Sequence, residues 1–438
     1  MDRKEINKNV TSIFIFASLV LACFPLFSFR LRSIITIIWS ILGVYIFLLS
    51  NAKPRFNSGL YVFLLPYTAL VFSLFWTENY SYGLDLLLRM LSFIVYPIVF
   101  WMTGHLFHKT LIKQIFYLFS ASTFLFVAFQ GYHVLLEYDH LFANLTADEI
   151  NANGFNSILD ISQEKINQIK LRRFRNFLIK CSGSHPTYQG LWISFVVFFL
   201  GIELFKNNYS LVTYVQIITI VFLVIWLFLI SSRMPVISLI MVSALAILLF
   251  SPMTGRVRVY FATILLGIGT LIFIIETPLS TRLVEFYNTG FELLRENEAI
   301  SRFNSSNTRN GIYFCDFDVL KDNFLFGLGI GDIQDKLNHC YTYKLSLEIF
   351  QWKNYNSHNQ YFFFWLSSGL LGIVSFLLFI FQTLRRAIVK KEIVLFFLVG
   401  ISSLVFMTEN ILERSDGLIF FSFFTSLLYF SSKNYEEI

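Results

Sequence analysis

The sequence predicts an all-α, polytopic membrane protein with about twelve transmembrane helices. Its 438 residues are 56% apolar and only 14% charged, whereas soluble domains carry about 25% charged residues. Apolar runs of roughly 17 to 25 residues recur through the chain, and each is long enough to cross about 30 Å of hydrocarbon as a helix. A membrane bundle is therefore the expected fold.

The first expected span is similar to a signal peptide in one respect, because the basic residues Arg3, Lys4 and Lys8 precede it. No small-residue cleavage site follows, so we expect an uncleaved anchor. The twelve expected spans lie at Thr11–Phe29, Ser33–Ser50, Gly59–Trp76, Leu84–Thr103, Leu111–Leu136, Thr187–Phe205, Leu211–Ile230, Met234–Phe250, Val259–Ile275, Tyr361–Phe381, Ile393–Met407 and Ile411–Phe430.

Orientation follows from the basic residues of the short loops, which accumulate on the cytoplasmic side. With the N-terminus inside, the inner segments hold fifteen Lys and Arg, and the short outer loops hold only Arg30, Arg32, Arg233 and Arg414. We therefore expect both termini in the cytoplasm. Two long segments then lie outside, and their length exempts them from the charge rule.

The expected organisation has five parts. They are residues 1–136 with transmembrane helices 1–5, residues 137–186 as a first periplasmic segment, residues 187–275 with helices 6–9, residues 276–360 as a large periplasmic loop, and residues 361–438 with helices 10–12 and a cytoplasmic tail. A structureless loop as long as the fourth part would be unusual. We expect a folded, mostly helical periplasmic cap over the outer end of the bundle.

Charge and cysteine content exclude some classes and leave one question open. The net charge of +6 is mostly a topology signal, and no basic, aromatic-interleaved soluble domain indicates nucleic-acid binding. No zinc-type cysteine cluster appears, so no metal site is predicted. Cys315 and Cys340 both fall in the large outer loop, where a disulfide is permitted. Three unpaired thiols, those of Cys315, Cys340 and Cys181 in the first outer segment, fit the sequence equally well.

Three polar residues at the outer edge of the membrane are candidate functional groups, because polar groups at this depth are costly. Arg233 in "LISSRMPV" is either an arginine that reaches lipid phosphates or a functional cation. Arg309 in "NSSNTRNGIYF" is either a solvated loop charge or a ligand for an anion.

His358 lies in "YNSHNQYFFFWLSSGLLG", at the mouth of the tenth expected span. A structural account exists, because Asn356 or Ser357 could cap the helix that follows. A functional account exists as well, since a neutral imidazole at a helix start, where the dipole disfavours protonation, could act as a general base.

Other polar motifs carry weaker signals. "FGLGIGD" lacks the preceding strand and the following lysine of a phosphate loop, so it predicts a turn with positive φ. Asp316 and Asp318 are spaced to lie on different faces of a helix, against a shared cation site. The segment "MTENILERSDG" is either a solvated loop or a group of charges that face the same outer cavity as His358, and its charged residues are Glu409, Glu413, Arg414 and Asp416.

Several segments together resemble one family. "RNGIYFCDFDVLKDNFLFGLGIGD", followed by "NSHNQYFFFWLSSGLLG", resembles the signature of the O-antigen ligase and polymerase family of bacterial envelope glycan assembly. "SGSHPTYQG", "SSRMP" and "TENILERSDGLIFF" are similar to further parts of its members. The resemblance covers the span count, the long penultimate outer loop and most of the second half. Before about Gly183 it extends only to hydropathy.

This resemblance implies a GT-C-like fold in the bacterial inner membrane and a periplasmic active site. It implies inverting transfer of a glycan from undecaprenyl diphosphate to a hydroxyl of lipid A-core, with no metal or cofactor. Arg233 and Arg309 would hold the diphosphate and His358 would be the base, although this chain has Tyr313 where members usually carry a tryptophan or similar residue. Further residues are expected to bind substrate: Asn359, His185, Glu409, Glu413 and Arg414.

Other functions fit parts of the same pattern. A polymerase would use the same chemistry with a second lipid-linked repeat as acceptor. A ligase that acts on protein usually carries an extra soluble domain, and none is seen here. A flippase for lipid-linked sugars predicts internal repeats, short loops and charges deep within the spans, whereas the polar residues here gather at one outer edge. An envelope scaffold would not need arginines beside a histidine.

Overall fold

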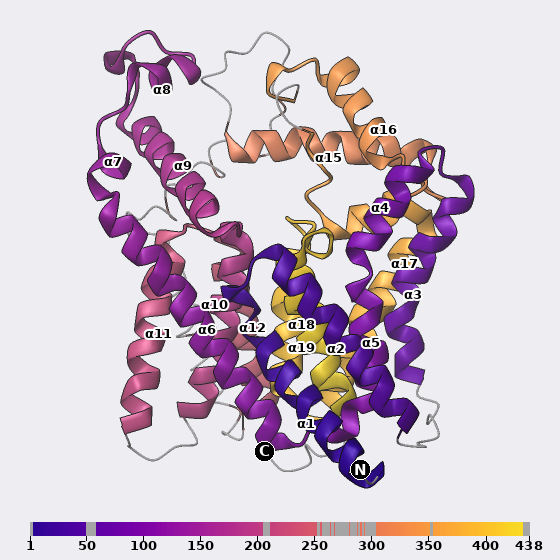
Figure 1. Cartoon of the computed structure of the whole chain (residues 1–438). Coiled ribbons are helices and arrows are strands. Elements are labelled where there is room, and N and C mark those ends of the chain that lie inside the picture. The colour runs from indigo at the N-terminus through magenta and orange to yellow at the C-terminus, as the bar shows by residue number, and fades with distance from the viewer. Residues whose placement is uncertain are drawn as a thin grey trace.

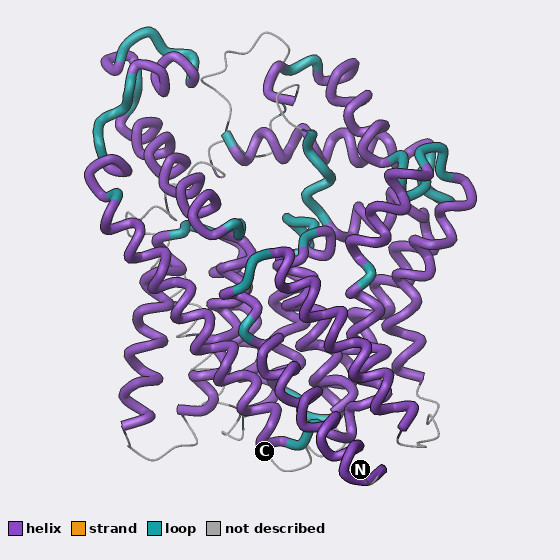
Figure 2. The backbone as a smooth tube through the Cα atoms, viewed as in Figure 1, coloured by secondary structure: helices purple, strands orange, loops and turns teal. Residues whose placement is uncertain are grey.

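The computed structural model describes residues 3–49, 58–204, 211–251, 304–350 and 354–431, with a few isolated positions between 255 and 293. Within these ranges every regular element is helical and no strand occurs (Figure 2). The expected all-α class is therefore confirmed for the described part of the chain.

Apolar helices form a bundle (Figure 1), and eight of those described are long and apolar enough to cross a membrane. Three more apolar helical stretches are shorter: Asn9–Ala22, which is part of α1 (Arg3–Ala22), α18 (Ile393–Val405) and α19 (Ser415–Ser431). The expected ninth span, Val259–Ile275, lies outside the described residues. The eight long helices are α2 (Phe29–Leu49), α3 with η2 (Ser58–Trp76), α4 (Tyr80–Met90) joined to α5 (Ser92–Thr103) and η3 (Gly104–Leu106), α6 (Lys109–Leu136), α10 (Pro186–Leu204), α11 (Leu211–Leu229), α12 (Arg233–Phe250) and α17 (Gln360–Val389).

Helix α19 lies inside the bundle and is buried along almost its whole length. It packs against α5 and α18, and its Phe423 ring lies 5.3 to 6.0 Å from the rings of Trp39, Tyr96 and Phe100. Edge-on ring pairs of this kind stabilise packing beyond the area they bury. In a bilayer, where helix association depends on packing rather than on burial from water, such a cluster is a suitable core.

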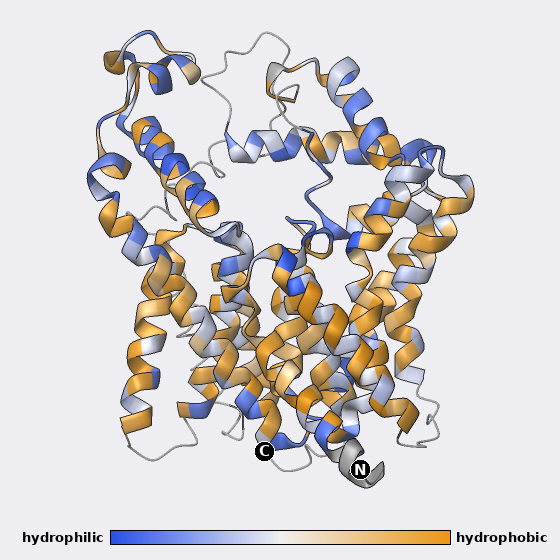
Figure 3. Ribbon diagram, in the orientation of Figure 1, coloured by the Kyte–Doolittle hydropathy of each residue, from blue (hydrophilic) through white to orange (hydrophobic). Residues whose placement is uncertain are grey.

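More polar helices lie beyond one end of the bundle, which we call the polar end (Figure 3). Both ends of the chain lie at the opposite end (Figure 1). The helices at the polar end are α7 (Tyr138–Phe142), α8 (Ala147–Ala152), η4 (Ile158–Asp160), α9 (Gln163–Ser182), α15 (Ser305–Asp322), α16 (Ile333–Cys340), η6 (Tyr341–Leu345) and η7 (Glu348–Phe350).

A disulfide between Cys315 and Cys340 joins α15 to α16, so the structure selects the bridged form of the two that the sequence allowed. Beside it, Asp316 is fully buried, and burial raises the pKa of its carboxyl well above the ordinary value. Asp318 instead pairs with Lys344. The prediction that the two aspartates lie on different faces is therefore confirmed.

The "FGLGIGD" segment forms a turn that docks into a break in α17. Helical geometry fails at Ser368 and Gly369, and the amides of Leu328 and Gly329 bond to the carbonyls of Leu366 and Ser367 at 2.7 and 3.0 Å. Backbone groups freed in an apolar helix need such partners. Gly327 and Gly329 have φ of +71° and +95°, so the predicted positive-φ turn is confirmed.

Asp332 ends this turn and fixes it to α4. Its two carboxylate oxygens accept hydrogen bonds from the amides of Glu78 and Asn79, at 2.8 and 2.7 Å. These amides lie at the start of α4, where an anion is also favoured by the helix dipole. The glycine-rich segment thus connects α4 and α17, and its sequence is explained without a nucleotide.

A buried ion pair between Arg32 of α2 and Asp416 of α19 corrects one expectation from the sequence. Arg32 also donates from Nε to the carbonyl of Phe24 at 2.9 Å. The sequence left two positions open for Asp416, a solvated loop or the cavity that His358 faces, and both are wrong because Asp416 is buried against Arg32. The cause is the depth of Arg32, which needs a carboxylate partner once it is removed from water.

Gly329→Ala is predicted to destabilise the protein. A Cβ at this position would lie 2.3 Å from Oγ1 of Thr77, and the backbone has positive φ. Strain and overlap together should cost at least about 2 kcal/mol, seen as a lower midpoint of thermal unfolding in detergent. Gly201→Ala on α10 is the matched control, because nothing lies within 4 Å of its added Cβ. Equal midpoints for the two variants would contradict this account.

Candidate active site

Four segments of the polar end carry residues that the sequence singled out. They are the turn before α17, the turn between α18 and α19, the first turns of α15, and the turn between α11 and α12. The hydrogen bonds and ion pairs between these segments define the candidate active site.

His358 is held in place from both sides along the chain. Its amide donates to Oδ1 of Asn356 at 3.2 Å, and its φ is +43°. On the other side, the side chain of Asn359 caps α17 by accepting from the amides of Tyr361 and Phe362. The cap is therefore Asn359, and the alternative that Asn356 or Ser357 caps this helix is wrong. A left-handed backbone at a histidine is uncommon, and these bonds maintain it.

Glu409 joins the candidate base to a candidate phosphate ligand. Its Oε2 lies 3.3 Å from Nδ1 of His358, and its Oε1 lies 3.2 Å from a guanidinium nitrogen of Arg309. Burial by itself raises the pKa of Glu409, but His358, Arg309 and His185 together lower that pKa below its ordinary value. Glu409 is therefore an anion at neutral pH, although only 11% of its side chain is exposed.

A second carboxylate supports the same turn. Glu413 accepts hydrogen bonds from the side-chain amides of Asn356 and Asn410, and Asn410 also bonds to the hydroxyl of Ser357. Burial raises the pKa of Glu413, while the two amide bonds and Arg414 oppose that rise. The structure thus links the segment around His358 to the turn between α18 and α19 through two carboxylates.

The two predicted arginines converge on the start of α15. Arg309 lies in the second turn of this helix, and Arg233 donates to the hydroxyls of Ser305 and Ser306 at 2.7 and 3.4 Å. Asn304 caps α15 through bonds to the amides of Ser306 and Asn307. The N-terminal end of a helix favours anions, so this end of α15 adds to the positive potential of the two guanidinium groups.

The other residues that the sequence predicts to bind substrate lie at different distances from the contacts of Glu409. His185 precedes α10 and lies within the electrostatic reach of Glu409, His358 and Arg309. Asn359 uses its carboxamide oxygen to cap α17, as described above. Arg414 is exposed on the turn that carries Glu413. The prediction that these side chains bind substrate remains a prediction.

One residue of this cluster was not singled out from the sequence. Arg175 of α9 donates to the carbonyl of Ser231 at 3.0 Å, and it lies within the electrostatic reach of Arg233, Arg309 and Glu409. It occurs in "KLRRFRNF", which predicts an amphipathic surface helix with several equivalent cations. Only the packing of α9 over the turn between α11 and α12 distinguishes Arg175 from its neighbours.

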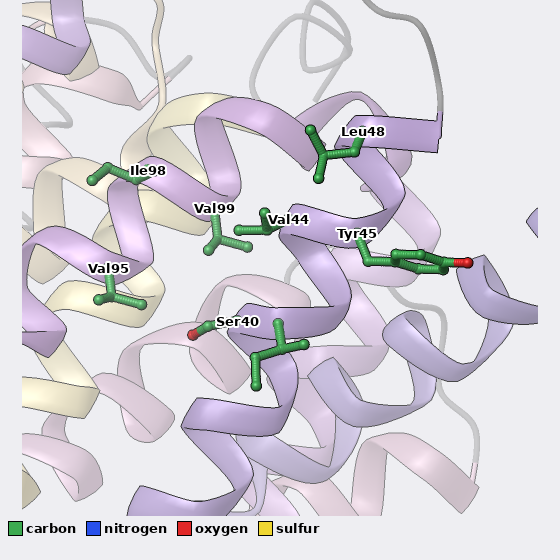
Figure 4. Close-up of a pocket in the computed structure, with 8 residues that line it drawn as sticks. Ser40, Val44, Tyr45, Leu48, Val95, Ile98 and Val99 are labelled. Carbon is green, nitrogen blue, oxygen red and sulfur yellow. The ribbon is translucent and has the colours of Figure 1, made fainter.

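An apolar groove of about 470 Å³ lies between α2 and α5, away from these residues (Figure 4). Its lining includes Ser40, Val44 and Leu48 of α2, and none of its lining residues belongs to the candidate active site. Within the described ranges, no three His, Cys, Asp or Glu side chains are grouped so as to hold a metal ion. The candidate active site brings together the imidazoles of His358 and His185, the carboxylates of Glu409 and Glu413, and the guanidinium groups of Arg175, Arg233 and Arg309.

Comparison with known proteins gives one family. A family model described as O-antigen ligase matches residues 218–377. This range begins within α11 and ends within α17, so it contains Arg233, Arg309 and His358, whereas Glu409, His185 and Arg175 lie outside it. No curated protein matches the chain.

The pH dependence of stability should report on the partly buried imidazole of His185. Burial lowers the pKa of His185 to about 4; Arg175, His358 and Arg309 also lower it, and Glu409 raises it. The folded protein then resists protonation while the unfolded chain takes up a proton near pH 6.5. Stability should therefore fall as pH falls, by roughly 1 to 2 kcal/mol between pH 7 and pH 5.

Thermal unfolding of His185→Gln at several pH values tests this expectation. The variant should lose less stability than the wild type between pH 7 and pH 5. His339→Gln on the exposed face of α16 is the control and should behave as the wild type. If His185→Gln retains the full pH dependence, the neutral state assigned to His185 in the folded protein is wrong.

Proposed function

Residues 218–377 belong to the O-antigen ligase family, and from this premise we propose that the chain is a membrane glycosyltransferase that ligates a lipid-linked glycan. In this proposal the donor is a glycan on undecaprenyl diphosphate and the acceptor is a hydroxyl of lipid A-core. The reaction takes place at the periplasmic face of the bacterial inner membrane, both termini are cytoplasmic, and no metal takes part.

One observation supports this proposal beyond the family match. The carboxylate of Glu409 contacts the imidazole of His358 with one oxygen and the guanidinium of Arg309 with the other. A base for the acceptor and a cation for the leaving group are thereby held in a fixed relation. Glycosyl transfer from a diphosphate needs this pair of functions, because one oxygen must lose a proton while another gains negative charge.

The base function is assigned to Nε2 of His358. With Nδ1–H directed at Glu409, Nε2 is the unprotonated nitrogen, and the carboxylate stabilises the imidazolium that forms. The acceptor oxygen attacks the anomeric carbon and passes its proton to Nε2. The bond between that carbon and the diphosphate oxygen breaks, and one displacement of this kind inverts the anomeric centre.

Stabilisation of the diphosphate leaving group is assigned to Arg233 and Arg309. The diphosphate keeps the electron pair of the broken bond, so its negative charge grows in the transition state. Guanidinium groups stay protonated and match phosphate oxygens with a fixed fork of donors. Charge stabilisation of this kind is often the largest single contribution to catalysis. The end of α15 adds its dipole in the same direction.

The apolar bundle accounts for the lipid part of the donor. A polyprenyl chain is soluble in the bilayer, so it needs no enclosed protein pocket and can remain beside the helices. His185, Asn359, Glu413 and Arg414 are assigned to the surfaces that receive the sugar and the acceptor. Their polar groups border the segments that carry His358 and Glu409.

His358→Ala is predicted to lower the transfer rate by about 10² to 10⁴, the usual contribution of a general base. Purified protein in detergent would be given the lipid-linked glycan together with lipid A-core, and glycosylated lipid A-core would be measured. His339→Ala, on the exposed face of α16, is the control and should keep wild-type activity. Full activity in His358→Ala would remove the proposed base.

The same assay distinguishes ligase from polymerase. Product on lipid A-core, lost in His358→Ala and in Arg233→Ala, is the result expected of a ligase. A ladder of lengthening lipid-linked chains, formed without lipid A-core, would make the chain a polymerase that uses the same residues.

A further inference from the structure

Helix α9 brings a third arginine to the candidate active site from a part of the chain outside the family match. Arg175 donates to the carbonyl of Ser231 at 3.0 Å. Ser231 belongs to the turn that carries Arg233 two residues later, and it has a φ of +50°. Arg175 is therefore fixed against the same turn as the first candidate phosphate ligand.

Arg175 differs from the other arginines of α9 in what surrounds it. Arg173 pairs with Glu149 and also donates to carbonyls near α7, so its charge is matched locally. Arg172 is exposed to solvent. Arg175 is partly buried, and it forms no ion pair with a carboxylate in the part of the chain that the structure describes.

The charges near Arg175 leave the cluster with excess positive charge. Burial lowers the pKa of Arg175 to about 10; Arg309 and Arg233 lower it further, and Glu409 opposes them. Among the described residues, Glu409 is thus the carboxylate that offsets the charge of Arg175, and it already contacts Arg309 and His358. Like charges held together out of water are costly unless an anion joins them.

We propose that Arg175 is a third ligand for the diphosphate of the donor, together with Arg233 and Arg309. This inference rests on the proposed function, and it adds a residue of α9 to the site that binds the donor. A diphosphate has two phosphoryl groups, and three guanidinium groups can bind the oxygens of both. The donor would thereby fix α9 over the bundle.

The test uses the full chain in detergent and inorganic pyrophosphate as the probe. Arg175→Gln and Arg175→Lys would be compared with the wild type for pyrophosphate affinity, measured by the rise in unfolding midpoint with concentration. Loss of one charge-assisted, forked contact should weaken affinity about 10- to 100-fold in Arg175→Gln. Arg175→Lys should lie between that variant and the wild type, because it keeps the charge and loses the fork.

Two further measurements separate a binding role from a structural one. Without pyrophosphate, Arg175→Gln should unfold at the wild-type temperature or above it, because one of three clustered charges is gone. A purely structural arginine would lower that temperature. In the transfer assay, the KM for the lipid-linked donor should rise, and the KM for the acceptor should not. Lys180→Gln, an exposed cation in the last turn of α9, is the control and should match the wild type.

The outcomes distinguish this inference from the proposed function. Wild-type transfer combined with unchanged pyrophosphate affinity in Arg175→Gln would overturn the role of Arg175 alone. Pyrophosphate binding that depends on Arg175, without any glycan transfer by the wild type, would support the anion site and contradict the proposed reaction. A raised KM for the acceptor instead of the donor, or no pyrophosphate binding by the wild type, would overturn the donor assignment.

Discussion

The polar end of this protein depends on one buried carboxylate. Glu409 is 8% exposed, and it contacts both His358 and Arg309, which come from segments far apart in the chain. An anion in this position must be paired, because an isolated buried charge is strongly unfavourable. The positions of the imidazole and of the guanidinium are therefore determined together, and a change in one disturbs the other.

The packing of α17 explains why this arrangement can be rigid. The helix begins directly after His358 with Asn359 as its cap, and Gln360 bonds to the amide of Leu412 at 2.9 Å. Farther along, the turn at Gly327 and Gly329 fills the break in the same helix. Sites built on supported helices keep catalytic groups in place more closely than sites on free loops. The residues that look like a phosphate loop serve this support instead.

Much of the fold follows from hydropathy, because each apolar run must satisfy its backbone as a helix. The break in α17 at Ser368 and Gly369 does not follow from hydropathy, because it depends on the glycine turn that docks there. Individual histidine and arginine candidates were visible as polar groups near membrane edges. Their partners were not, since Glu409 follows His358 by more than fifty residues and the contact exists only after α18 folds back.

The positions of Asp416 and Arg175 could not be predicted from the sequence, for related physical reasons. The charged neighbours of Asp416 in sequence indicate either a solvated loop or the cavity of His358, whereas its actual position depends on its pairing with the deeply placed Arg32. Arg175 was overlooked because sequence alone shows a basic helix face without saying which cation is covered. Both cases depend on tertiary packing, which selects one residue from several that look equivalent.

The central claim is that His358 and Glu409 act as one unit, and a double-mutant cycle on the transfer rate tests it most directly. Glutamine at position 409 keeps an oxygen for Arg309 but removes the charge that stabilises the imidazolium. We predict that Glu409→Gln lowers the rate about 100-fold in the wild type and less than about threefold in His358→Ala, since coupled residues are not additive. Equal losses in both backgrounds would show that the two residues act independently and would contradict the account.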